Sequence, residues 1–63
     1  MRKDIELLLK NIRATQRYCE DLGDRSSDTL VTLQAKAAAE CARHTGDTLA
    51  NLKKALEIQG KNP

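Results

Sequence analysis

The chain has 63 residues, 40% of them hydrophobic and 32% charged, with no Phe or Trp and a single Tyr. This length allows one domain, and without large aromatic side chains it leaves little apolar volume for a self-sufficient core. The net charge of +2 is too small to indicate nucleic-acid binding by itself, and no run approaches the ~20 apolar residues of a membrane span. The chain is therefore expected to need a disulfide, a metal ion or a partner chain.

The first helix is predicted over residues 3–22. Apolar or small residues recur there at intervals of three and four, which places them on one stripe of a helix: Ile5, Leu8, Ile12, Thr15, Cys19 and Leu22. A turn is predicted over 23–28, because Gly23 suits the left-handed residue that commonly ends a helix. Three residues of this turn are suited to cap the next helix: Ser26, Ser27 and Asp28.

The second helix is predicted over residues 29–58, followed by a frayed tail at 59–63. Its stripe has the same spacing: Val31, Ala35, Ala38, Ala42, Thr45, Leu49, Leu52 and Leu56. Gly46 offers a break at 45–47, which would give a three-helix bundle, and the pattern Asp-Thr-Leu-x-x-Leu occurs at both 28 and 47. The stripe keeps its phase through Gly46, and this favours one long helix.

A hairpin folded at residues 24–28 predicts a register between the two helices. Three pairs are expected side by side: Leu22 with Val31, Ile12 with Ala42, and Ile5 with Leu49. Three residues are then expected to project beyond the first helix: Leu52, Ala55 and Leu56. This overhang predicts that the second helix folds back or that another chain covers it.

The apolar arc of the second helix is wider than one neighbouring helix can bury. A second stripe lies beside the first on a helical wheel: Leu30, Leu33, Ala37, Cys41 and Thr48. The predicted fold is therefore all-α, a helical hairpin that dimerises into a four-helix bundle. The residues predicted to form the protein interface are Leu7, Leu9, Leu30, Leu33, Ala37, Cys41, Leu52 and Leu56.

The candidates for chemistry are few. In the predicted register Cys19 and Cys41 lie nearly two turns apart, about 10 Å, whereas a disulfide needs α-carbons within about 7 Å. Both are expected to be buried apolar fillers, the alternative being a bridge or redox switch between two chains. Cys41 and His44 share a helix face, but two ligands in each chain make a weak zinc motif. We expect no enzyme, no cofactor, no metal and a cytoplasmic location.

A basic arc on the first helix is the one suggestive charged surface. It lies opposite the Ile5–Leu22 stripe and comprises Lys3, Lys10, Arg13 and Arg17. A solvated helix face explains such a pattern in most helices. The alternative is contact with phosphates, although Glu6 and Glu20 flank the arc and no aromatic side chain in it could stack on bases.

In chain length, mid-chain turn and Ala-rich seam, the sequence resembles the Rop family of small plasmid RNA-binding proteins. The resemblance implies hairpins that dimerise into four-helix bundles and bind paired RNA loops through the outer face of the first helices. It would place Lys10, Arg13 and Arg17 on that face.

The sequence thus predicts a small non-enzymatic protein that acts by protein–protein contact. It would be a homo-oligomeric regulator, or an adaptor or inhibitor that binds another protein. The alternative is a Rop-like RNA-binding modulator, and no membrane partner is expected.

Overall fold

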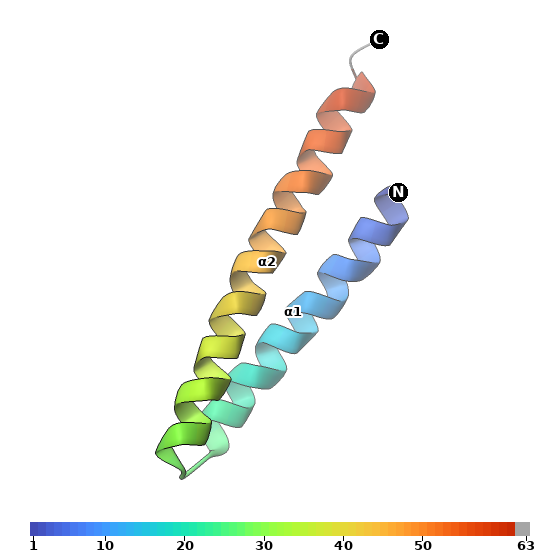
Figure 1. The fold of residues 1–63 in the computed structure, drawn as a ribbon. Helices are drawn as coiled ribbons and strands as arrows, with labels where there is room; N and C mark the ends of the chain where they lie inside the picture. The colour runs from blue at the N-terminus through green and yellow to red at the C-terminus, as the bar shows by residue number, and fades with distance from the viewer. Residues whose placement is uncertain (62–63) are drawn as a thin grey trace.

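A computed structural model describes residues 1–61 as two antiparallel helices, α1 (Arg2–Arg25) and α2 (Thr29–Lys61) (Figure 1). Residues 26–28 connect them. The helical hairpin is confirmed, and α2 runs through Gly46 without a break, so the alternative three-helix bundle is not adopted. Of the predicted tail, Gln59 to Lys61 belong to α2, and residues 62–63 lie outside the described part of the chain.

α1 ends at Arg25, one turn later than predicted, because Gly23 does not stop it. No glycine in the described residues has a positive φ, so the predicted left-handed cap is wrong. Gly23 is instead helical and buried, and a β-carbon there would lie 3.1 Å from Lys36 Cγ and 3.6 Å from Ala35 Cβ. Its missing side chain therefore lets the two helices approach closely beside the turn.

Asp28 begins α2 as its N-cap. Its Oδ1 accepts a hydrogen bond from Val31 N at 3.0 Å, and its carbonyl accepts from Thr32 N at 2.9 Å. The side-chain bond pairs one of the helix's first N–H groups, which otherwise lack partners within the helix. Ser26 Oγ in turn accepts from Asp28 N at 3.1 Å and orders the three-residue connection.

Replacement of Asp28 by Ala is expected to lower the free energy of unfolding by about 1 kcal/mol, the usual cost of losing such a cap. Ser27→Ala is the matched control in the same turn, because Ser27 is exposed and its side chain makes no hydrogen bond within the described residues. Urea unfolding followed by circular dichroism measures both. Equal midpoints for the two variants would show that the cap contributes nothing.

The register of the hairpin differs from the predicted one by about one and a half turns. Arg13 pairs with Asp47 at 2.9 Å and Glu6 with Lys53 at 3.3 Å. Ile12 therefore lies near the level of Asp47 rather than of Ala42, because α1 is longer and the connection shorter than predicted. The predicted overhang of Leu52, Ala55 and Leu56 is wrong for the same reason, since Lys53 lies beside α1. Only the last part of α2 extends past the start of α1 (Figure 1).

The hairpin has a thin core. Three apolar side chains are buried, Ile5, Ala39 and Ala42, each 5–6% exposed, and no side chain in the described residues is fully enclosed. The molecule measures 55 × 15 × 11 Å, and its radius of gyration is 15.1 Å. A compact domain of this length would have about 11 Å. Most of the apolar side chains are therefore left outside the contact between α1 and α2.

Candidate protein-interaction face

The apolar stripe of each helix is divided between the seam of the hairpin and the solvent, and its members alternate between the two. On α1 the buried or half-buried members are Ile5, Ile12 and Cys19, whereas the exposed members are Leu8, Thr15 and Leu22. On α2 the buried or half-buried members are Ala35, Ala42, Leu49 and Leu56, whereas the exposed members are Val31, Ala38, Thr45 and Leu52.

This alternation follows from where each stripe is directed. Residues seven apart lie within about 20° of each other around a helix, whereas the two alternating sets differ by three or four residues, about 40–60°. If each stripe were directed at the other helix, both sets would be covered. The other helix covers only one set, so both stripes point to the same side of the hairpin. Stripes point this way when a hairpin is half of a helix bundle whose central axis lies beside the hairpin.

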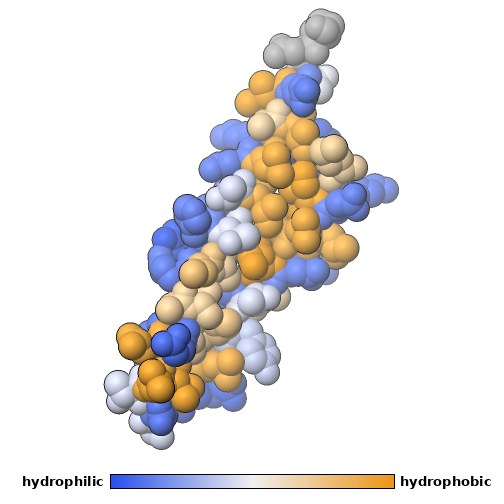
Figure 2. All heavy atoms as spheres, viewed as in Figure 1, coloured by the Kyte–Doolittle hydropathy of each residue, from blue (hydrophilic) through white to orange (hydrophobic). Residues whose placement is uncertain are grey.

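We call the seven exposed members the open face. It comprises Leu8, Thr15, Leu22, Val31, Ala38, Thr45 and Leu52. Since the helices are antiparallel, both exposed sets turn to the same side of the hairpin. Figure 2 shows apolar side chains along both helices on this side, with hydrophilic ones at the two edges. The large members are 41–53% exposed, and exposed apolar side chains grouped on one face make it a candidate interaction surface.

The predicted interface residues fall into two groups. Leu52 belongs to the open face, and five others are exposed beside it or farther around the helices: Leu7, Leu30, Leu33, Ala37 and Cys41. The remaining two, Leu9 and Leu56, are half-buried. Leu8, Leu22, Val31 and Ala38 were not among the predicted interface residues, and the structure leaves all four exposed because only half of each stripe enters the contact between the helices. The width of the stripes was the signal that could have found them.

Charged side chains close the opposite side of the seam. Arg13 Nη2 donates to Asp47 Oδ1 at 2.9 Å, and Arg43 Nη1 donates to Asp47 Oδ2 at 3.2 Å. Arg43 also pairs with Glu40, and Lys53 pairs with Glu6 at 3.3 Å. The charges of this side of the hairpin, which we call the ionic side, are paired within the chain, whereas the exposed stripe residues lie on the open face.

The ionic side predicts a loss of stability in acid. The hydrogen bond from Arg13 lowers the pKa of Asp47 below its ordinary 3.8, and that from Arg43 lowers the pKa of Glu40 below 4.5. A carboxyl group whose folded pKa is depressed stabilises the fold fully above about pH 5 and less as pH falls through the folded pKa. The melting temperature should therefore fall between pH 5 and pH 3. Asp47→Asn should fall less steeply, and parallel curves for the two proteins would contradict this assignment.

Arg13 explains why a glycine stands at position 46. A β-carbon there would lie 2.6 Å from Arg13 Nη1 and 2.7 Å from Arg13 Cζ, so Gly46→Ala must displace the guanidinium from Asp47. Ala favours a helix by about 1 kcal/mol relative to Gly. In the chain with Arg13, the loss of the contact between Arg13 and Asp47 should cancel this gain in the free energy of unfolding. In an Arg13→Ala background the same substitution should give the full gain. Urea unfolding of the four proteins measures the difference, and equal gains in both backgrounds would exclude the clash.

The predicted basic arc is not one group in the folded chain. Lys3, Lys10 and Arg17 are exposed, and no acidic side chain in the described part of the chain lies within salt-bridge distance of them. Arg13 is half-buried instead, and its guanidinium lies across the seam on α2. Three residues at seven-residue intervals remain as a row along the outside of α1.

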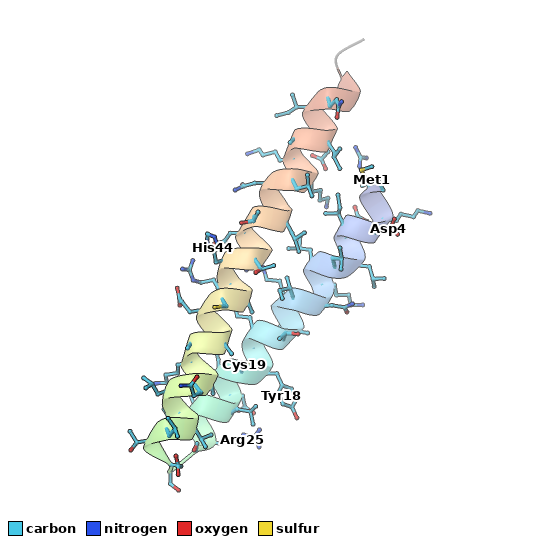
Figure 3. All side chains as sticks on the ribbon, viewed as in Figure 1. Met1, Asp4, Tyr18, Cys19, Arg25 and His44 are labelled. Atoms are coloured by element: carbon cyan, nitrogen blue, oxygen red, sulfur yellow. The ribbon has the colours of Figure 1, made fainter. Side chains whose placement is uncertain are left out.

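The two cysteines are free, one half-buried and one exposed, so the expectation that both are buried fillers is wrong for Cys41. The observed register places Cys19 near the level of Glu40 and Cys41, which corrects the predicted separation of two turns. Cys41 is exposed on α2. His44 lies on the outer edge of α2, away from Cys19 and Tyr18 (Figure 3). Among residues 1–61 no three His, Cys, Asp or Glu side chains are placed to hold a metal ion.

Comparison of the chain with protein-family models, with curated proteins and with solved structures gives no match. The resemblance to the Rop family therefore stays a prediction from the sequence. In the described residues, neither helix has the length and apolar character that crossing a membrane requires. The two features of the described residues that could bind a partner are the open face and the row of basic residues.

Proposed function

We propose that this protein is a non-enzymatic helical module that acts by protein–protein contact through the open face. The alternation of the stripe residues carries the proposal, because it leaves half of each stripe directed at an absent neighbour. A regulator that associates with its own kind and an adaptor or inhibitor that binds another protein both use such a surface. Two free thiols suit a reducing compartment such as the cytoplasm.

The sizes of the side chains on the open face also suit it to packing against other helices. Leucine and valine lie at its two ends and small residues at its middle, where Ala38 and Thr45 allow another backbone to approach. Large and small side chains interdigitate in this way in well-packed helical layers. The ionic side lacks these properties, so the contact is expected on one side of the hairpin only.

The test is crosslinking in the source cell with two tagged variants that differ in where they place one charge. Ala38→Glu puts a carboxylate at the middle of the open face, whereas Asn51→Glu puts one on an exposed position of the same helix outside it. The wild type and Asn51→Glu should crosslink to the same protein, whether this is a second copy of the chain or another protein. Ala38→Glu should not form this crosslinked product. Identical products from all three would refute the proposal.

A second candidate function is contact with RNA through the row of Lys3, Lys10 and Arg17. The absence of ion-pair partners for these residues among residues 1–61 favours it. It predicts affinity for structured RNA that falls steeply with salt and is lost in Lys10→Glu/Arg17→Glu. Arg13→Glu should weaken the hairpin instead, because Arg13 is engaged with Asp47. No shift with structured RNA at low salt would exclude this function.

A further inference from the structure

We infer that the open face is covered by a second copy of this chain, in the antiparallel sense, so that two hairpins form a four-helix bundle with their turns at opposite ends. The inference rests on the proposed function and names the partner. Three observations carry it: the amount of surface left exposed, the order of side-chain sizes along the open face, and the distribution of charge between the two ends of the hairpin.

The exposed surface matches what a dimer needs to bury. The chain exposes 5033 Å² for a mass of 7.0 kDa, whereas a compact monomer of that mass exposes about 4,000 Å². The excess of about 1,000 Å² is close to the roughly 800 Å² that each partner contributes to a standard interface. A second hairpin of the same length would cover the open face from end to end, which a short peptide would not.

The open face is complementary to itself about a two-fold axis through its middle. In the observed register Leu8 lies level with Leu52, Thr15 with Thr45, and Leu22 with Ala38, whereas Val31 lies nearer the turn. An axis at the level of Thr15 and Thr45 brings Leu8 of one copy towards Leu22 of the other, and Leu52 towards Ala38. Small residues face small residues at the axis and let the four helices approach.

Charge selects the antiparallel arrangement. Residues 20–40, which form the turn end of the hairpin, carry five acidic and two basic side chains, a net charge of −3. The rest of the chain carries nine basic and four acidic side chains, a net charge of +5. With turns at opposite ends, the acidic end of each copy lies against the basic part of the other. With both turns at the same end, the two acidic ends would lie together and so would the two basic parts. Repulsion between like charges would disfavour this parallel arrangement.

The first experiment is sedimentation equilibrium of the reduced chain at micromolar concentration, with circular dichroism of the same samples. We expect a helical dimer. Ala38→Glu should raise its dissociation constant by about 100-fold or more, because an unpaired charge would be buried in the contact between the two copies, whereas Asn51→Glu should leave it within about threefold. Equal constants for the two variants would overturn the placement of the interface on the open face.

The second experiment measures the arrangement. A spin label is attached to Ser27→Cys, at the exposed turn, in a Cys19→Ala/Cys41→Ala background that is first shown to dimerise like the wild type. Antiparallel hairpins place the labels at opposite ends of a molecule 55 Å long, so the distance by pulsed electron resonance should exceed about 40 Å, since each residue of a helix spans about 1.5 Å. A distance near 10–20 Å, as for turns on adjacent helices, would overturn the antiparallel arrangement.

The outcomes also separate this inference from the proposed function. A monomer with little helix would overturn the inference that a second copy covers the open face. It would leave the open face as the contact surface for a different protein. A monomer that is fully helical and unfolds cooperatively would overturn both, because the open face would then need no covering at all.

Discussion

Substitution of Ala42 by Asp is expected to abolish the folded hairpin at micromolar concentration. Ala42 is 5% exposed and is one of three buried apolar side chains. A carboxylate at this position loses its hydration, and the nearby guanidinium of Arg13, which lies over Gly46 one turn away, is already paired with Asp47. An unpaired buried charge costs several kcal/mol, whereas a core of this size supplies only about 3–5 kcal/mol. The mean helicity should therefore fall towards that of the unfolded chain.

Ala37→Asp is the matched control, because it makes the same chemical change on the same helix at an exposed position. It should cost no more than the difference in helix propensity, about 0.7 kcal/mol or less. Circular dichroism melts at one protein concentration compare the two variants. If Ala42→Asp melted within a few degrees of Ala37→Asp, the seam of the hairpin would not be the core described above.

The elements of this fold could be predicted from the sequence because apolar periodicity and good helix formers extend over both helices. The stripe that continues in phase through Gly46 correctly indicated a continuous α2. The register could not be predicted, because it depended on the residue at which α1 ends. Gly23 is common both as a left-handed cap and as a point of close helix contact, and only packing against Ala35 and Lys36 shows which applies.

The open face was only half predictable for a related reason. Periodicity tells which residues share a stripe, but the direction of that stripe relative to the other helix depends on how the hairpin packs. Arg13 decides much of this packing: it crosses to Asp47 over the bare backbone of Gly46 and closes one side of the seam. Arg13, which was predicted to lie on the outer basic face, therefore contributes to the contact between the helices. The basic row on the outside of α1 keeps only Lys3, Lys10 and Arg17.

The midpoint of thermal unfolding is expected to rise with protein concentration if two copies share the open face. Folding is then coupled to association, and each tenfold increase in concentration contributes about 1.4 kcal/mol to the stability of the dimer. For an assembly of two such chains this corresponds to roughly 3–6 °C for each tenfold step. Scanning calorimetry at 5, 50 and 500 μM should show a total rise of about 6–12 °C.

Ala38→Glu supplies the contrast, because the variant should melt early and at a temperature that does not depend on concentration in the same range. Asn51→Glu should follow the wild type. A wild-type midpoint that stays constant over the hundredfold range, together with a cooperative transition, would mean that Ile5, Ala39 and Ala42 suffice to hold the hairpin as a monomer. The coupling of folding to association follows from the thin core: only about half of each apolar stripe is buried by the chain itself, so the covering of the other half should decide whether the helices persist.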